Sequence, residues 1–263
     1  MNYEQSEWHA FTPGQVDTIK KNDSIVCVKE NFLSQDEFET LQKILLEHKD
    51  WPERGELSDM YGLHWDEVPN ETLTIKQQIR DILEDKMRGV IGDFKLDFMI
   101  LQHSNQPWYT HVDWRWSEDK IPYMTAVIPI AEIDKNGQLI DPTDWKDTHT
   151  IVFKQSNYGA EEDAKQMGIE GSKGNLLRVR KCYTDPGAVN FTGSYSITYD
   201  DYEKYLSHLK YEEIFGLEID TVVKWKPRMM SFHPQARYHC ASNFHAEGLS
   251  KKYSIVLFTL HDT

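Results

Sequence analysis

From residue 94 onward, this 263-residue chain contains a series of short apolar segments. Turns separate these segments, and few helices lie between them. Each segment is rich in aromatic and β-branched residues, which favour β-strands. The predicted strands span residues 94–101, 108–116, 123–130, 148–153, 221–225, 228–232, 238–240 and 253–260. Successive strands without intervening helices pair antiparallel, so the sequence predicts a sandwich or barrel and argues against a parallel α/β sheet.

The helical patterns lie mainly before residue 93. A short strand is predicted at 25–28. Ser34 and Glu37 then have the spacing of a capping box, which marks the start of a helix. This helix is predicted to end before Trp51. A second helix is predicted from about residue 71 to 87, with Gly89 closing it.

We expect a single domain over residues 1–263, because a chain of this length can bury one full core. An N-terminal strand and helices occupy about 1–92, and a barrel occupies about 93–263. The stretch 133–218 is polar and rich in glycine and aspartate, contains a predicted helix at 199–209, and is expected to be an insertion. Long glycine-containing loops often act as lids, and residues 190–195 have that composition.

Composition excludes some classes of function. The net charge is −14 and no basic run occurs, which disfavours nucleic-acid binding. This charge would tolerate a cationic small molecule, and it is equally consistent with a merely solvating surface. No apolar stretch is long enough for a membrane span, and the first residues do not resemble a signal sequence. Three isolated cysteines, Cys27, Cys182 and Cys240, form no disulfide framework and favour a reducing cytoplasm.

Three His-any-Asp triplets occur, at residues 48–50, 64–66 and 111–113, and a single triplet is a weak signal. The first ends a predicted helix and the second lies in a predicted loop. Only His111 is predicted within a strand, where residues two apart share a face, so His111 and Asp113 point the same way. This is the arrangement that two ligands of one metal require. A cross-strand hydrogen-bonded pair is the alternative.

A third metal ligand is predicted in the C-terminal strands. His239 lies in a return strand that follows a turn at 234–236, and His233 and His245 compete for the same role. Two imidazoles and one carboxylate on one face of a non-heme iron leave the opposite face open for chemistry.

Lys252 and Ser254 share a face of the last predicted strand. A lysine inside a barrel is costly to bury unless an anion meets it, and a carboxylate co-substrate would be such an anion. The alternative is that Lys252 marks a solvent-exposed strand end.

The order of these segments along the chain, and the strands in which they are predicted, resemble those of the Fe(II)- and 2-oxoglutarate-dependent oxygenases. The resemblance covers about residues 24–46 and 96–263. It rests on VKENFLSQDEF, LQHSNQPWYTHVDW, YMTAVIPI, WKPRMMSFHPQARYHCASNF and KKYSIVLFT. It implies a mainly β fold with flanking helices, namely a double-stranded β-helix, which is a jelly-roll, cupin-like barrel.

The resemblance also implies a site and a reaction. The metal ligands for Fe(II) would be His111, Asp113 and His239. The co-substrate 2-oxoglutarate would be bound by Lys252 and Ser254, with Arg237 and Thr125 as further candidates. The usual basic residue at the position of Lys252 is arginine, which is why Arg237 is an alternative. With O2, such an enzyme would hydroxylate an unactivated C–H bond of a small polar metabolite such as an amino acid, releasing succinate and CO2.

The substrate pocket is predicted from the residues that flank the ligands, which are Gln102, Tyr109, Trp114 and Tyr123. The expected partner is a small molecule, not a nucleic acid or a membrane. Two alternatives stay open: a non-catalytic jelly-roll binding module, and an oxygen-independent cupin-like metal hydrolase or isomerase.

Overall fold

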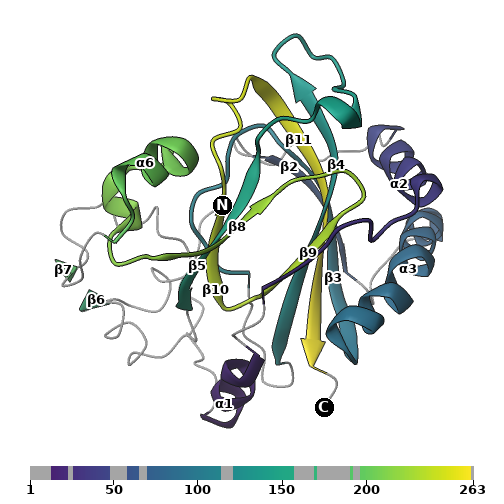
Figure 1. Cartoon of the computed structure of the whole chain (residues 1–263). Coiled ribbons are helices and arrows are strands. Elements are labelled where there is room, and N and C mark those ends of the chain that lie inside the picture. Colours follow the sequence, from purple (N-terminus) through teal and green to yellow (C-terminus); the bar gives the residue numbers. More distant parts are fainter. Residues whose placement is uncertain are drawn as a thin grey trace.

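In the described part of the chain, two antiparallel sheets face each other and helices lie outside them (Figure 1). The computed structural model describes residues 13–22, 26–47, 58–64, 70–113, 121–156, 169–170, 190–191 and 196–261. Within these residues, no helix has the length and apolar character to cross a bilayer.

The larger sheet has six strands in the order β1-β9-β4-β11-β3-β2. Their bounds are β1 Cys27–Lys29, β2 Ser58–His64, β3 Phe94–Ser104, β4 Pro122–Asp134, β9 Met230–Pro234 and β11 Leu249–His261. The two 13-residue strands, β4 and β11, pair along nearly their whole length at its centre.

The smaller sheet has the order β10-β5-β8, with β5 His149–Ser156, β8 Ile219–Lys224 and β10 Arg237–Ala241. An isolated bridge between His111 and His239 adds the segment around His111 to its edge. From β3 onward, the chain crosses repeatedly between the two sheets. This arrangement confirms the predicted double-stranded β-helix, although the two sheets do not close into one continuous barrel. A separate two-stranded ladder joins β6 Ile169–Glu170 to β7 Asn190–Phe191.

Helices α2 Gln35–Glu47 and α3 Asn70–Ile91 lie against the outer face of the larger sheet (Figure 1). The predicted capping box is present, since Glu37 N donates to Ser34 Oγ and Ser34 N donates to Glu37 Oε2. One face of α2 buries Phe38, Leu41 and Leu45, a spacing that matches the helical repeat. Helix α3 ends four residues later than predicted, before Gly92 rather than at Gly89. Gly92 has φ 78°, the left-handed conformation that favours glycine after a helix.

A second apolar cluster covers the outer face of the smaller sheet. It joins Ile151, Phe153 and Tyr238 of that sheet to Ile19 of α1 Pro13–Asn22 and to the helical segment near Leu206. That segment comprises α6 Tyr199–Asp201 and the π-helical turn η3 Tyr202–Leu206, followed by the 3₁₀ turn η4 Tyr211–Ile214. A further 3₁₀ turn, η1, spans Pro142–Asp144. The predicted helix at 199–209 is therefore present but shorter.

Three predictions about elements need correction. Residues 108–113 form no strand and hold only the bridge at His111. His64 ends strand β2 instead of lying in a loop. The predicted insertion at 133–218 contains β5, which pairs with β10 and β8 and therefore belongs to the core. Most of the predicted lid at 190–195 lies outside the described residues.

Candidate metal centre

Backbone hydrogen bonds bring the two distant ligand segments together. His111 N donates to His239 O at 3.0 Å, and His239 N donates to His111 O at 2.9 Å. Asp113 N donates to Gln235 O at 3.0 Å. Residues that exchange both hydrogen bonds lie directly opposite each other, and their side chains share one face. The pairing therefore places the two imidazoles side by side, with ring centroids 4.3 Å apart.

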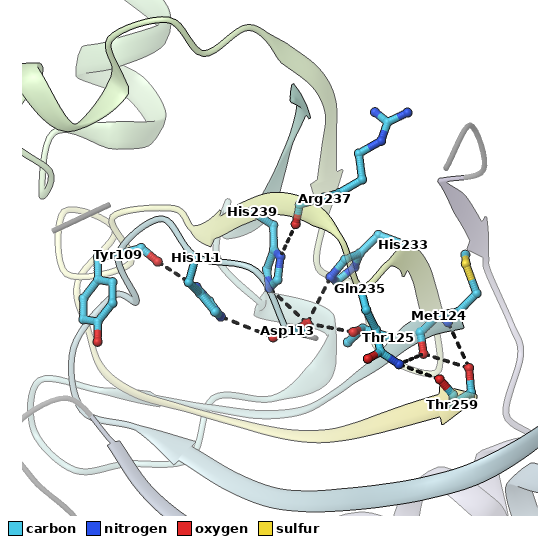
Figure 2. Close-up of polar contacts among 10 residues, drawn as sticks. All are labelled: Tyr109, His111, Asp113, Met124, Thr125, His233, Gln235, Arg237, His239 and Thr259. Carbon is cyan, nitrogen blue, oxygen red and sulfur yellow. Dashed lines mark hydrogen bonds and ion pairs between the residues drawn. The ribbon is translucent and has the colours of Figure 1, made fainter. Parts of the chain in front are cut away.

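One donor atom from each of His111, Asp113 and His239 lies within 4.8 Å of the other two (Figure 2). His111 Nε2 is 3.5 Å from Asp113 Oδ1, and His239 Nε2 is 3.3 Å from Asp113 Oδ2. The structure thus brings together the predicted ligand set of two imidazoles and one carboxylate.

Backbone carbonyl groups fix the orientation of both imidazoles. His111 Nδ1 lies 2.8 Å from Tyr109 O, and His239 Nδ1 lies 3.1 Å from Arg237 O. A carbonyl oxygen only accepts, so each Nδ1 carries the proton and each Nε2 presents a lone pair towards Asp113. Histidine ligands of metals are commonly oriented in this way.

Burial sets the protonation of the cluster. It lowers the pKa of His239 to about 3, against the opposing effect of Asp113, so this imidazole is neutral at neutral pH. Burial acts to raise the pKa of Asp113, but His239, His111 and His233 outweigh it and hold this pKa well below its usual range. The site therefore combines a neutral imidazole at His239 with an ionised carboxylate at Asp113, which are the forms that bind a metal.

This donor set fits a divalent cation. The Nε2 lone pairs and the carboxylate oxygens are all acceptors, and acceptors facing one another at 3.3–3.5 Å repel unless a positive charge lies between them. Nitrogen and oxygen ligands of this kind suit non-heme iron and other first-row transition metals.

Two further side chains contact Asp113. Thr125 Oγ1 donates to Asp113 Oδ2 at 2.7 Å, so the hydroxyl of Thr125 is engaged by the carboxylate. His233, which was the second choice for the distal ligand, lies 3.5 Å from the same oxygen. The other competitor, His245, places its Nδ1 against Leu249 O.

Lys252 is buried inside the molecule, not at an exposed strand end. Its Nζ lies 3.2 Å from the centre of the Trp225 ring and has no hydrogen-bond partner among the described residues. Burial lowers the pKa of Lys252 to about 7, although Glu132, its cross-strand neighbour, acts in the opposite direction. An unpaired buried ammonium group is costly, and an anionic ligand would satisfy it.

Ser254 and Gln102 lie near Lys252 on the inner face of the larger sheet. They are cross-strand partners on β11 and β3, and both are buried. Gln102 Nε2 donates to Ser104 Oγ at 3.0 Å, and Ser104 is in turn the cross-strand partner of Lys252. A small polar surface therefore surrounds the lysine.

Other predicted site residues lie elsewhere. The guanidinium group of Arg237 contacts Asp220 at 3.3 Å and Phe153 O at 3.3 Å, and it points away from the three ligands (Figure 2). This placement argues against Arg237 as the co-substrate cation. Tyr123 donates its hydroxyl to Ile91 O at the end of α3, which does not support a pocket role. Tyr109 contributes its carbonyl oxygen to His111, and Trp114 lies outside the described residues.

Sequence reasoning missed the contributions of Gln235 and Trp225. Gln235 was assigned only to a turn, but its side chain donates to Thr259 O at 2.6 Å and its carbonyl oxygen holds Asp113 N. Trp225 was assigned to a strand, but it covers Lys252. No sequence signal identifies such contacts, because they depend on how distant strands face one another.

Comparisons with known proteins identify the fold. No family model matches the sequence, and no curated protein matches it. Among solved structures, the non-heme alpha-ketoglutarate-dependent carbocyclase SnoK from nogalamycin biosynthesis has a TM-score of 0.50 at 11% identity, covering 95% of this chain and 84% of that chain. The related epimerase SnoN has a TM-score of 0.49 at 12% identity, covering 96% and 85%. HygX from Streptomyces hygroscopicus, with nickel and 2-oxoglutarate bound, has a TM-score of 0.45 at 12% identity, covering 96% and 88%. The likeness to the carbocyclase establishes a shared fold.

Proposed function

We propose that this chain, which has the fold of a non-heme alpha-ketoglutarate-dependent enzyme, is an Fe(II)- and 2-oxoglutarate-dependent oxygenase. The observation that carries the proposal is the convergence of His111, Asp113 and His239. Both histidines have their Nδ1 atoms committed to backbone carbonyl oxygens, which leaves each Nε2 for the metal. A fold alone would not support a function, whereas a site with this chemistry does.

In this proposal, the three ligands hold Fe(II). They contribute a single negative charge, so a bound divalent ion keeps a net positive charge that attracts an anionic 2-oxo acid. Bound iron would supply the oxidation of an unactivated C–H bond by O2, coupled to conversion of 2-oxoglutarate to succinate and CO2.

Lys252 and Ser254 bind the far carboxylate of 2-oxoglutarate in the proposed enzyme. The unpaired Nζ of Lys252 supports this role, as does the burial of both residues on one face of β11. A charged hydrogen bond inside a protein is stronger than a neutral one, and exclusion of water strengthens it further. The rings of Trp225 and Phe244, with centres 3.2 and 5.6 Å from Nζ, help to exclude water.

For the substrate, we propose a small polar metabolite such as an amino acid, which the enzyme would hydroxylate. The carboxylate of Asp113 supports hydroxylation, or desaturation as the alternative, over halogenation, because halogenating enzymes of the resembled family replace this ligand with a small residue. Gln102, which is buried on β3 opposite Ser254, stays our candidate for the lining of the substrate pocket.

Anaerobic titration of the Fe(II)-loaded protein with 2-oxoglutarate tests the proposal. We expect a visible metal-to-ligand charge-transfer band in the wild type and none in His111→Ala. Absence of the band from folded, iron-loaded wild type would reject the oxygenase. Tight binding of another ligand would then favour a jelly-roll binding module, and turnover without O2 would favour a cupin-like hydrolase or isomerase.

A further inference from the structure

His233 is a third imidazole beside the ligand cluster. It lies near the end of β9, directly opposite Thr125 of β4, and only 1% of its surface is exposed. Its ring centroid lies 4.2 Å from that of His239, and its Nε2 lies 3.5 Å from Asp113 Oδ2. The proposed metal ligands are His111, Asp113 and His239, and this set gives His233 no role.

The two oxygens of Asp113 have different surroundings. His111 approaches Oδ1, whereas Thr125, His233 and the ligand His239 all approach Oδ2 (Figure 2). The figure shows His111 and His233 on opposite sides of the carboxylate. Oδ2 therefore faces two groups that are able to donate hydrogen bonds, Thr125 and His233, besides the lone pair of His239, whereas Oδ1 faces only the lone pair of His111 among the described contacts.

A packing role does not explain His233. Its Nε2 is buried without an ordinary hydrogen-bond partner among the described residues, and burying an unpaired polar atom costs free energy that an apolar side chain would avoid. The neighbouring Phe232 packs into the apolar cluster beneath α2 and α3, whereas His233 pairs with Thr125 on the side of the ligands. The nearest acceptor that is recorded for its Nε2 is Asp113 Oδ2, at a distance that a small shift would close.

We propose that His233 is a positioning residue that, together with Thr125, holds Oδ2 of Asp113 and so fixes the orientation of this carboxylate in the proposed metal site. His233 donates its Nε2–H, and Thr125 donates its hydroxyl. The inference rests on the proposed metal site and adds to it a pair of residues that fixes how the carboxylate binds. Such outer partners orient ligands, and their loss typically weakens metal binding about 10–100-fold.

The test measures Co(II) binding to the full-length protein by calorimetry, together with the visible d–d absorption of the Co(II) form, which reports coordination geometry. We expect His233→Leu to weaken Co(II) affinity by about 10–100-fold and to change the d–d spectrum. We expect His233→Gln to restore most of the affinity, because its amide nitrogen occupies a position similar to Nε2. His233→Asn, whose shorter amide does not reach Oδ2, should not restore it.

His103→Leu is the matched control. His103 is also a buried histidine of the larger sheet, but its ring packs against Tyr253, 5.3 Å away. The His103→Leu protein should lose thermal stability without losing Co(II) affinity. This control separates a general packing defect from an effect on Asp113.

Each outcome decides between the two proposals. Wild-type protein that binds no Co(II) would overturn the metal site, and with it this inference. Wild-type binding combined with unchanged affinity and spectrum in His233→Leu would overturn the inference alone. If His233→Leu does not fold, the Gln and Asn variants decide, and equal Co(II) affinity in both would overturn the positioning role.

Discussion

Lys252 shows how the environment of one residue sets its chemistry. Its ammonium group lies against an aromatic ring, and burial lowers its pKa to about 7. A cation over the face of a tryptophan is stabilised by the ring quadrupole, but this interaction leaves its N–H donors available. Those donors give the buried lysine a way to recognise an anion.

We predict that Lys252→Met weakens binding of 2-oxoglutarate to the metal-loaded, anaerobic protein. Loss of a charged hydrogen bond of about 1.5–3 kcal/mol corresponds to about a 10–150-fold rise in the dissociation constant. Calorimetric titration measures the effect. Lys154→Met is the control, because Lys154 is exposed and pairs with Glu218 at 2.9 Å. Equal affinity in wild type and Lys252→Met would remove Lys252 from the co-substrate site.

The lowered pKa of Lys252, about 7, predicts that 2-oxoglutarate binding is linked to proton uptake. Above pH 7 the free protein holds mostly neutral Lys252, and a bound carboxylate favours the charged form. Binding therefore takes up close to one proton between pH 7 and the pKa of the complex, and affinity falls by up to about tenfold per pH unit there. Titrations in two buffers of different ionisation enthalpy measure this uptake. Affinity independent of pH between 7.5 and 9 would contradict the linkage.

At the residue scale, the sequence predicts the side chains with distinctive chemistry but not their partners. Burying a polar or charged side chain in an apolar strand costs free energy, so such a residue indicates a functional role. This signal identified His111, Asp113, His239 and Lys252. The contacts of Thr125 and His233 with Asp113 were not, because they depend on the register between β4 and β9. A histidine or threonine in a strand is otherwise unremarkable.

At the scale of elements, the turn between β9 and β10 positions Asp113, the carboxylate of the proposed metal site. Gln235 in this turn binds Thr259 O and Met124 O through its side chain and Asp113 N through its carbonyl oxygen. One residue therefore links the ligand segment to β4 and β11. The position of Asp113 depends on this link as well as on its own side chain.

We predict that Gln235→Leu both destabilises the protein and weakens metal binding. Removing a buried donor costs about 1–3 kcal/mol, which lowers the melting temperature by about 2–4 °C per kcal/mol. Thermal denaturation and Co(II) titration measure the two effects. In Gln42→Leu, which removes a similar bond from α2 to Ile130 O, only stability should fall. Unchanged Co(II) affinity in Gln235→Leu would show that the turn does not position Asp113.

Element prediction succeeded where local signals are strong. The capping box of Ser34 and Glu37 began α2 as expected, and the apolar runs in β3, β4 and β11 were strands. Prediction failed for residues 108–113, where aromatic composition favours a strand but the backbone forms only an isolated bridge at His111 and no continuous ladder. Helix α1 and strand β2 were missed, because each depends on packing or pairing with distant residues and not on a clear local period.

At the scale of the whole molecule, the candidate metal centre joins the two sheets. Asp113 contacts Thr125 of the larger sheet, and His239 belongs to the smaller one. A metal bound there is a shared contact, so its binding should stabilise the fold as a unit. The single domain and the lid stay predictions, since much of the stretch between β5 and α6 lies outside the described residues.

We predict that Co(II) raises the melting temperature. Ligand at about 100 times its dissociation constant adds about 2.7 kcal/mol, or about 5–11 °C for a chain of this size. Differential scanning calorimetry measures the shift, and addition of 2-oxoglutarate should increase it further. His111→Ala should show little response. An equal shift in this variant would place the stabilising ion elsewhere.

The pairing of His111 with His239 has a consequence for how the chain tolerates change. These residues meet through their own backbone hydrogen bonds, so everything between them forms a closed loop whose ends are fixed. The entropy of loop closure grows slowly, by about 0.6 kcal/mol for each doubling of length. Surface segments between the two histidines are therefore able to lengthen, shorten or change sequence at small cost. Such changes would reshape access to the proposed metal site while leaving His111 and His239 in place.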